Sequence, residues 1–421
     1  MLLPSLKNKT VTVWGKGAEG IAAADFLTRF GAQPVFVCDP LEKPLRGIVV
    51  KSPGISPYRD DVAEARQNGA VFTSGTNLFM EYVSGLKKRP RLVGVTGTKG
   101  KSTTSSLIAH VLNASGYKTA LGGNIGKPVV SYAFDAENYD VVVDEISSYQ
   151  AADLLYGFDV CVVLNLYPEH IDWHKTHERY YRDKLNILTH RAAGQKAVLN
   201  AQNERLCVMT ADCADVVFYN AADGVHVRDG FFYDADRRLF ETDAVPLLGR
   251  HNSENVCAVL SVLKLLNVDL STVKEAFQTF CALPHRLQTV AVKNGVRYVD
   301  DSISTTPETT LAALKAFEGE RIVLIAGGYD RAQDYKTLAS FVAQRADTVV
   351  VTVPSTGHRL AQNVRDAGGK AYETTDLPSA VDVAKHLDAS VVLLSPAAPS
   401  YDFYKNFEER GDLFHACVAR I

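Results

Sequence analysis

Short apolar runs alternate with amphipathic helical stretches along most of this 421-residue chain. Near-continuous apolar runs of this kind are typical of parallel strands that are covered by helices on both faces, so the pattern predicts an α/β protein. The runs that we expect to form strands are Thr10–Trp14, Pro34–Cys38, Arg91–Val95, Tyr139–Asp144, Val160–Asn165, Arg321–Ala326, Thr348–Val353 and Ser390–Leu394.

The alternation restarts three times, which predicts three α/β domains, within the two to four that the length allows. The basic segment Gly85–Pro90, which contains glycine and proline, marks the first boundary, and Leu283-Pro284 marks the second, after a helical stretch over 252–282. We therefore expect domains at 1–89, 90–282 and 283–421. Residues 216–246 alternate in short segments with Gly and Asp turns, which predicts antiparallel hairpins on the middle domain.

Composition excludes several classes of protein. Lys+Arg 45 against Asp+Glu 48 gives a net charge of -3, without the basic excess of a nucleic-acid binder. No apolar run approaches the ~18 residues that span a bilayer, and the N-terminus lacks the pattern of a signal peptide. The seven scattered cysteines form no Cys-x-x-Cys pair, which indicates reduced thiols. We expect a cytoplasmic protein with no nucleic-acid or membrane partner.

The segment Gly94–Thr104 joins an apolar strand to a helix through a glycine turn that ends in Lys-Ser. Loop N–H groups and the helix dipole attract phosphate oxygens at such a place. Lys101 is expected to reach the β- and γ-phosphates, and Ser102 to bind Mg²⁺. The strict phosphate-loop pattern is not met, because Val95 occupies the position of its first glycine. The other expected nucleotide contacts of the loop are Gly97, Thr98, Lys99, Gly100 and Thr103.

A second glycine turn follows the first strand, with Gly15, Gly17 and Gly20 in the spacing G-x-G-x-x-G and Asp39 about 20 residues further on. The spacing fits a dinucleotide site of the NAD type. It fits equally a site for another diphosphate, such as that of a UDP-sugar, and it also fits close packing of a helix on a strand without any ligand.

Two polar side chains stand at the ends of expected strands in the middle domain. Glu145 follows the strand Tyr139–Asp144, and His170 follows Val160–Asn165. Ligands of open α/β sheets bind at the carboxyl ends of the strands, so both side chains are expected beside the phosphate loop, where they are candidate metal ligands.

Several segments, in this order along the chain, resemble the Mur ligases, most of all the members that add glutamate to UDP-N-acetylmuramoyl-L-alanine. The ending Lys405–Gly411 is absent from the related folylpolyglutamate synthases. The resemblance implies a Rossmann-like domain for UDP, a P-loop ATPase-like domain for ATP and Mg²⁺, and a second Rossmann-like domain for the amino acid. The matching segments are Ser52–Ser56, Thr96–Thr103, Gly123–Gly126, Glu145–Gln150, Glu169-His170, His251–Asn255, His285-Arg286, Asp301-Ser302, Gly327-Gly328, Ser395-Pro396 and Phe407–Gly411.

The resemblance also implies roles for individual residues. The UDP substrate is expected at Gly15, Gly17, Gly20, Asp39, Ser52, Gly54, Asn77, Asn124 and Ser147. Beyond the phosphate loop, ATP is expected to contact Asn252 and Asn255 through adenine, Arg286 through its phosphates and Asp301 through its ribose. Two Mg²⁺ ions are expected at Ser102, Glu145, His170 and a carbamylated Lys184. Glutamate is expected at Thr305, Arg331, Ser400, Tyr401 and Phe407.

The activity that the resemblance implies is ATP-dependent amide-bond formation through an acyl phosphate, in peptidoglycan precursor synthesis. Lys101, His170, Lys184 and Arg286 are the expected catalytic residues, and the expected oligomeric state is a monomer. Two rival hypotheses are a dehydrogenase that uses Gly15–Gly20 for NAD and a non-catalytic nucleotide-binding regulator. The first leaves the phosphate loop unexplained, and the retained catalytic residues argue against the second.

The sequence departs from the family at the segment Asp301–Pro307. The D-glutamate enzymes usually carry Asp-Ser-Lys-Ala-Thr-Asn there, and Ile303 replaces the lysine that helps to neutralise the glutamate carboxylates. Arg331 is the expected replacement cation. The Ser-Ile-Ser-Thr version, together with Tyr167–Trp173, is similar to a branch that adds L-glutamate, whose product is epimerised afterwards. D-glutamate is the family default, and L-glutamate is the alternative.

Overall fold

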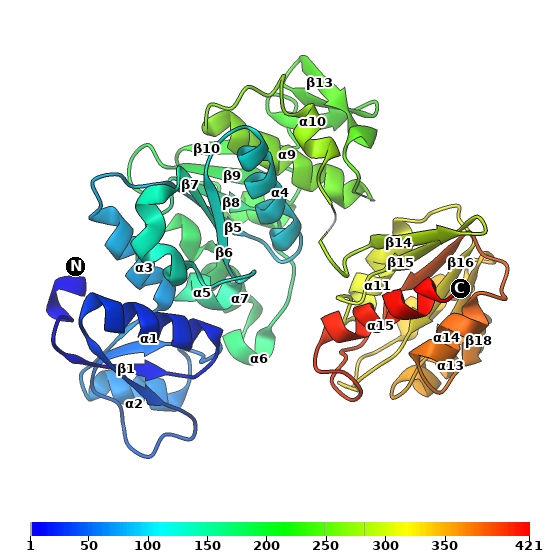
Figure 1. The fold of residues 1–421 in the computed structure, drawn as a ribbon, viewed down its shortest axis with the longest axis horizontal. Helices are drawn as coiled ribbons and strands as arrows, with labels where there is room; N and C mark the ends of the chain where they lie inside the picture. The colour runs from blue at the N-terminus through cyan, green and yellow to red at the C-terminus, as the bar shows by residue number, and fades with distance from the viewer. Residues whose placement is uncertain (1, 248, 282) are drawn as a thin grey trace. The chain divides into compact units, whose positions relative to one another are not determined.

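The computed structural model describes residues 2–247, 249–281 and 283–421. The chain forms two compact units, which are Met1–Pro246 with His251–Phe280, and Leu247–Arg250 with Cys281–Ile421 (Figure 1). Ala282, the expected last residue of the middle domain, lies outside the described residues. The division at 89, 282 and 421 therefore stays a prediction.

The first unit begins with a sheet of four parallel strands in the order β2-β1-β3-β4. Apolar side chains of α1 and α3 pack against this sheet and against η2 of the following segment. The elements are η1 (Leu3–Ser5), β1 (Thr10–Trp14), α1 (Ala18–Phe30), β2 (Gln33–Val37), β3 (Gly47–Lys51), α2 (Asp60–Gln67), β4 (Ala70–Thr73), α3 (Gly75–Ser84) and η2 (Val129–Asn138).

The same unit holds a second sheet, of six parallel strands in the order β10-β9-β8-β5-β7-β6. Because β5 lies between β7 and β8, the loop that leaves β5 is flanked by the carboxyl ends of both neighbours. The elements are β5 (Arg91–Thr96), α4 (Lys101–Ala114), β6 (Thr119–Gly123), β7 (Val141–Glu145), α5 (Ser148–Ala152), β8 (Val160–Val163), α6 (Ile171–His174), α7 (His177–Leu185), η3 (Asn186–Leu188), β9 (Lys196–Asn200), α8 (Glu204–Met209) and β10 (Val216–Tyr219).

Buried contacts join the two sheets of this unit. Nζ of Lys51, at the end of β3, donates a hydrogen bond to Oδ2 of Asp153 at 2.7 Å and another to the carbonyl oxygen of Ile55 at 2.7 Å. The Lys51 side chain is only 1% exposed. A buried charge is stable only when it is paired, so this ion pair holds the loop after β3 against the segment after α5.

Two expectations for the middle of the chain need correction. The segment over 216–246 is not made of hairpins alone, because β10 joins the parallel sheet and only β11 (Val225–Arg228), β12 (Phe231–Asp234) and β13 (Arg237–Glu241) form an antiparallel sheet, followed by η4 (Thr242–Ala244). The helical stretch over 252–282 is interrupted: it contains α9 (Arg250–Leu265) and α10 (Lys274–Gln278).

The second unit holds a sheet of six strands in the order β14-β15-β19-β16-β17-β18, in which β14 alone runs antiparallel to its neighbour. Two buried apolar clusters lie on this sheet. The elements are β14 (Gln288–Lys293), β15 (Val296–Asp300), α11 (Pro307–Lys315), β16 (Ile322–Ala326), α12 (Lys336–Ala343), β17 (Thr348–Thr352), α13 (Gly357–Asp366), β18 (Lys370–Glu373), α14 (Leu377–Ala384), β19 (Val391–Leu394) and α15 (Phe407–Ala419).

Two further features of the described part of the chain bear on its chemistry. None of its helices is both long enough and apolar enough to cross a membrane. Its seven cysteines are all free thiols.

Candidate active site

The phosphate loop spans residues 97–100, between the end of β5 and the start of α4. Gly97 and Gly100 have φ angles of +155° and +86°, which side chains rarely adopt. A Cβ atom on Gly100 would lie 2.5 Å from Oδ1 of Asn255, so α9 packs directly on the loop. Nδ2 of Asn255 donates to Oδ1 of Asn252 at 3.2 Å. Both asparagines expected at adenine therefore lie beside the expected phosphate site.

Two threonines of this segment are buried, and one of them, Thr98, holds the loop in place. Oγ1 of Thr98 accepts a hydrogen bond from the backbone N–H of Tyr167 at 2.9 Å and shares one with the Tyr180 hydroxyl at 2.8 Å. Thr103 is buried in α4. The backbone N–H of Lys99 donates to Oδ1 of Asn165 at 2.8 Å.

Two lysines meet at the same carbonyl group of the loop. Nζ of Lys101 donates to the carbonyl oxygens of Gly97 at 3.0 Å and Thr98 at 3.2 Å. Nζ of Lys184, in α7, also donates to the Gly97 carbonyl oxygen at 3.0 Å. Burial, with a further contribution from Lys101, lowers the pKa of Lys184 well below its ordinary value. Ser102, the expected metal ligand, is the second residue of α4.

The carboxylate of Glu145 lies at the end of β7, with one oxygen engaged and one available. Oε1 accepts a hydrogen bond from Nδ2 of Asn124 at 2.8 Å. Oε2 is buried and has no hydrogen-bond partner in the described part of the chain. An unpartnered buried carboxylate oxygen fits a divalent cation, because such a cation supplies the missing interaction.

His170 comes immediately before α6, and its side chain is 46% exposed. Its Nε2 lies 3.6 Å from Oε2 of Glu169, whose other oxygen accepts a hydrogen bond from Nζ of Lys99 at 2.7 Å. Partial burial lowers the pKa of His170, although Glu169 acts in the opposite direction. A lower pKa favours the neutral imidazole, which is the form that binds metals.

A pocket of about 580 Å³ lies between the two sheets of the first unit. It contains most of the residues expected to bind the nucleotide substrate, which are Gly15, Gly17, Asp39, Ser52, Gly54, Asn124 and Ser147. Other residues of its lining were not predicted from the sequence, among them Trp14, Glu19, Ile55, Tyr149 and Gln150. Glu19, Ile55, Tyr149 and Gln150 lie within motifs quoted above, but no role was expected of them, because the pocket forms only when the two sheets pack together.

Two expected substrate residues do not line this pocket. A Cβ atom on Gly20 would lie 2.1 Å from the carbonyl oxygen of Gly15, so Gly20 permits close packing of α1 on the loop before it. The Asn77 side chain donates to the carbonyl oxygen of Asp153 at 2.7 Å and accepts from the N–H of Leu155 at 2.9 Å. A role for either residue in substrate binding stays a prediction.

Asp39 lines the pocket, and its carboxylate accepts hydrogen bonds from two neighbouring side chains. It accepts hydrogen bonds from Nη1 and Nη2 of Arg59 at 2.6 and 3.1 Å, and from Nε1 of Trp14 at 3.0 Å. The hydrogen bonds from Arg59 lower the pKa of Asp39. Arg59 therefore pairs with the carboxylate that Asp39 contributes to the pocket wall.

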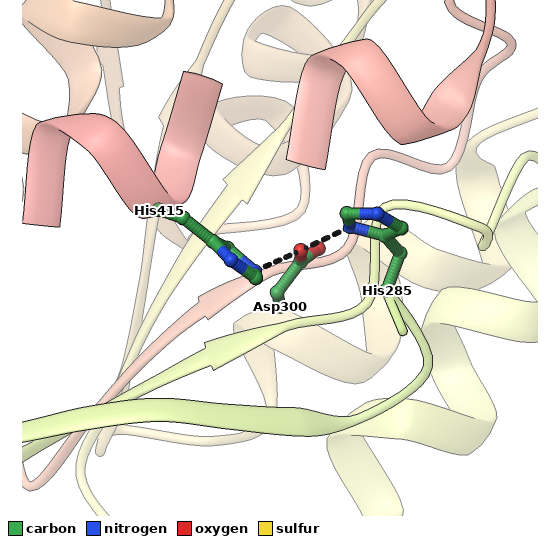
Figure 2. A group of neighbouring side chains, drawn as sticks. All are labelled: His285, Asp300 and His415. Atoms are coloured by element: carbon green, nitrogen blue, oxygen red, sulfur yellow. Dashed lines mark hydrogen bonds and ion pairs between the residues drawn. The ribbon is translucent and has the colours of Figure 1, made fainter. Parts of the chain in front are cut away.

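In the second unit, Arg286 and Asp301 are expected to contact ATP. The residue before each of them, His285 or Asp300, belongs to a hydrogen-bonded cluster. Oδ2 of Asp300, at the end of β15, lies 2.7 Å from Nδ1 of His285 and 2.8 Å from Nε2 of His415 (Figure 2). Two imidazoles and a carboxylate are transition-metal ligands in many proteins. Here both rings are directed at one carboxylate oxygen, and the cluster holds α15 against the segments that carry Arg286 and Asp301.

The carboxylate of Asp301 is buried and hydrogen-bonded within the second unit. Oδ2 accepts from Oγ of Ser395 at 2.8 Å, and Oδ1 accepts from the N–H of Leu287 at 3.2 Å. Burial raises the pKa of Asp301 to about 6. Its expected contact with the ribose stays a prediction.

Three residues expected at glutamate lie together in the second unit. The Arg331 guanidinium lies 5.5 Å from the centre of the Tyr401 ring. Gln333 connects this pair to Thr305, because its side chain donates to the Thr305 carbonyl oxygen at 3.1 Å and accepts from the Arg331 N–H at 3.4 Å. The backbone of Arg331, the expected replacement cation, is therefore connected through Gln333 to the segment that contains Ile303.

Ser400 and Phe407 are the other two expected glutamate residues, and Ser302 connects Phe407 to a buried cation, Arg410, for which the sequence predicted no role. Arg410 is 2% exposed, and it donates to Oγ and the carbonyl oxygen of Ser302 at 3.0 and 2.8 Å and to the Ala398 carbonyl oxygen at 3.0 Å. Burial lowers its pKa to about 10. Oγ of Ser302 also donates to the Phe407 carbonyl oxygen at 2.8 Å.

Family models match both units. The Mur ligase middle domain matches residues 95–263, and the Mur ligase glutamate ligase domain matches residues 285–398. A UDP-N-acetylmuramoyl-L-alanine–L-glutamate ligase of Xanthomonas campestris pv. campestris is 37% identical, over 98% of this chain and 96% of that protein. The chain belongs to the Mur ligase family. A Micromonospora protein with the same name is 38% identical, over 99% of this chain and 98% of its own.

Solved structures of Mur ligases share the fold. The UDP-N-acetylmuramoylalanyl-D-glutamyl-2,6-diaminopimelate–D-alanyl-D-alanyl ligase of Acinetobacter baumannii has a TM-score of 0.66 at 15% identity, and covers 89% of this chain and 91% of its own. MurF ligase from Thermotoga maritima, solved in complex with ADP, has a TM-score of 0.60 at 18% identity, and covers 90% and 97%. The predicted α/β Mur ligase fold is thereby confirmed.

Proposed function

We propose that this Mur ligase joins glutamate to UDP-N-acetylmuramoyl-L-alanine at the expense of ATP, in peptidoglycan precursor synthesis. One observation carries the proposal. Asn124 lines the 580 Å³ pocket, and its side chain donates to Glu145, whose second oxygen is buried and has no hydrogen-bond partner among the described residues. A substrate in the pocket would thus present its reacting end to the place where the γ-phosphate of ATP is held.

The chemistry follows from these groups. The alanyl carboxylate attacks the γ-phosphorus, the bond to the β–γ bridging oxygen breaks, and ADP leaves. The ammonium group of Lys101 stabilises the charge on the transferring phosphoryl group, and Arg286 is proposed to assist it. The amine of glutamate then attacks the acyl carbon and loses a proton, and phosphate leaves. Mg²⁺, held by Ser102, Glu145, His170 and a carbamylated Lys184, would supply Lewis-acid neutralisation of the phosphate oxygens when bound.

The environment of Lys184 supports the carbamate. Burial lowers its pKa well below the ordinary value for lysine, which raises the fraction of neutral amine at neutral pH. Only the neutral amine can attack CO₂. The product is an anion beside Lys101, so carbamylation would convert a repulsive pair of amines into an attractive pair.

We propose L-glutamate as the amino acid, in place of the D-glutamate default. The support comes from the relatives at 37–38% identity, which are named as L-glutamate ligases, and from Ile303 at the position of the family lysine. Arg331, beside Tyr401 and connected to Thr305 through Gln333, is proposed to pair with a glutamate carboxylate.

The test is phosphate release with ATP, Mg²⁺ and UDP-N-acetylmuramoyl-L-alanine, with D- and L-glutamate compared at equal concentrations. Release that requires the UDP substrate and glutamate together, with a strong preference for L, is the expected result. A strong preference for D would reject the assignment of handedness alone. Absence of release with either amino acid would reject the proposed function.

A further inference from the structure

A buried chain of hydrogen bonds runs through the first unit, close to the expected metal ligands. Nδ1 of His174 lies 2.6 Å from Oδ2 of Asp183, and Nε2 lies 3.0 Å from Oγ of Ser148. The exposed fractions of the three residues are 0% for His174, 8% for Asp183 and 4% for Ser148. We call these residues the histidine bridge.

The order of atoms is that of a hydrolase triad, yet the surroundings point to a different use. A catalytic serine must reach its substrate. Ser148 is buried and is not part of the lining of the 580 Å³ pocket, although its neighbours Ser147 and Tyr149 are. The histidine bridge therefore connects segments of the chain and does not attack a substrate.

The segments that the histidine bridge connects contain or adjoin three of the four expected metal ligands. Ser148 begins α5, three residues after Glu145. His174 ends α6, which begins immediately after His170. Asp183 lies in α7, next to Lys184. One imidazole thus joins three helices that are separate in the sequence: α5 begins three residues after Glu145, α6 begins immediately after His170, and α7 contains Lys184.

The histidine bridge also contacts the wall of the substrate pocket. The Tyr58 hydroxyl donates to Oδ1 of Asp183 at 2.7 Å. Next to His174, Nε1 of Trp173 donates to the carbonyl oxygen of Gly54 at 3.0 Å, and the Trp173 carbonyl oxygen accepts from Oγ of Ser56 at 2.7 Å. Gly54 lines the pocket. The loop after β3 and the segments near the expected metal ligands are therefore held by hydrogen bonds to the same residues, Asp183 and the neighbours Trp173 and His174.

We propose that His174 is a positioning residue that sets the spacing of Glu145, His170 and Lys184, and so the affinity of the site for a divalent cation. This inference rests on the proposed function, because it takes those three residues as metal ligands. Residues that orient metal ligands from outside change metal affinity or activity by about 10- to 100-fold when they are replaced.

The experiment compares His174→Ala with His177→Ala, which removes an exposed imidazole from α7. Binding of Mn²⁺ alone is followed by the electron paramagnetic resonance signal of the free ion, and kcat and the KM for glutamate are measured in parallel. His174→Ala should weaken Mn²⁺ binding and lower kcat by about 10- to 100-fold. The KM for glutamate should stay unchanged, because the expected glutamate residues belong to the other unit, and His177→Ala should match the wild type.

Two conservative variants separate positioning from general loss of packing. The amide of His174→Asn can still reach Asp183, and that of His174→Gln can reach toward Ser148, so each should recover part of the Mn²⁺ affinity. If His174→Ala fails to fold, as judged by circular dichroism, Ser148→Ala takes its place with the same expected direction, because it removes a single hydrogen bond of the bridge.

Several outcomes would overturn the inference. They are unchanged Mn²⁺ affinity in the bridge variant, an equal loss in His177→Ala, or absence of saturable Mn²⁺ binding to the wild type. Mn²⁺ binding does not depend on turnover. A wild type that binds Mn²⁺ but releases no phosphate with either glutamate rejects the proposed function, while the Mn²⁺ comparison still decides the role of His174.

Discussion

Replacement of Gly100, at the start of α4, should reduce the rate of ATP use. Gly116, beyond the end of the same helix, provides a matched control position. Gly100 precedes α4 with φ +86°, and Gly116 follows it with φ +87°. A Cβ atom on Gly100 would lie 2.5 Å from Oδ1 of Asn255, whereas one on Gly116 would meet nothing within 4 Å. The two alanine variants therefore share one backbone cost and differ in one contact.

The shared cost is that of a left-handed conformation for an L-residue, roughly 1–2 kcal/mol. Gly100→Ala must in addition displace Asn255, which breaks its hydrogen bond to Asn252 and adds roughly 0.5–1.5 kcal/mol. Displacement of a phosphate-binding loop by about 1 Å can lower the rate by about 100-fold, because the reacting groups lose their alignment. Gly116 lies at the other end of the helix and carries no such penalty.

Thermal unfolding and steady-state kinetics with varied ATP measure the two effects. Gly116→Ala should lower Tm by about 2–5 °C and leave kcat/KM for ATP unchanged. Gly100→Ala should lower Tm further and reduce kcat/KM for ATP by about 10- to 100-fold. Equal stability losses, or an unchanged kcat/KM in Gly100→Ala, would refute the reasoning that Asn255 packs on a functional phosphate loop.

Three further predictions follow from charged groups. Lys101→Ala should abolish phosphate release and leave the circular dichroism spectrum unchanged; residual turnover near the wild-type rate would contradict its role. Arg331→Ala should raise the KM for glutamate by at least about tenfold, as expected for loss of a charge-assisted hydrogen bond, with the KM for ATP unchanged; an unchanged KM for glutamate would show that Arg331 does not compensate for Ile303. Burial raises the pKa of Glu19 from 4.5 to about 6, so the folded state keeps this proton to higher pH than the unfolded state. Stability should therefore fall by up to roughly 2 kcal/mol as the pH rises through this window, and urea unfolding of Glu19→Gln should show a weaker pH dependence; parallel profiles would reject the assignment.

Local patterns predicted the parts of the fold that local physics determines. The apolar runs located β1, β5, β8, β16, β17 and β19 to within one or two residues, because a strand buried on both faces must be apolar throughout. Gly97 and Gly100 marked the phosphate loop, because a turn with positive φ requires glycine. The position of Glu145 at the end of an expected strand predicted that it lies near this loop, because neighbouring parallel strands end at the same edge of a sheet.

Features that depend on packing between distant segments could not be read in the same way. Nothing in the sequence assigns Trp14, Glu19 and Tyr149 a binding role, and they become pocket residues only when the two sheets pack together. Arg410 was visible within a family motif, yet nothing in the motif shows that its guanidinium turns inward to Ser302. Residues 216–219 belong to a segment patterned like a hairpin, but they form a strand that pairs in parallel with residues 197–200.

The contacts between the two sheets of the first unit have a consequence for recombination within the family. Lys51 and Tyr58 belong to the N-terminal segment, and their partners Asp153 and Asp183 belong to the middle segment. A chimera that exchanges residues 1–89 with a relative would keep one half of each pair. Removing one partner of a buried ion pair costs about 3–5 kcal/mol, a large part of the stability of a typical domain. The linker at Gly85–Pro90 is therefore a poor crossover point unless both partners of each pair are transferred.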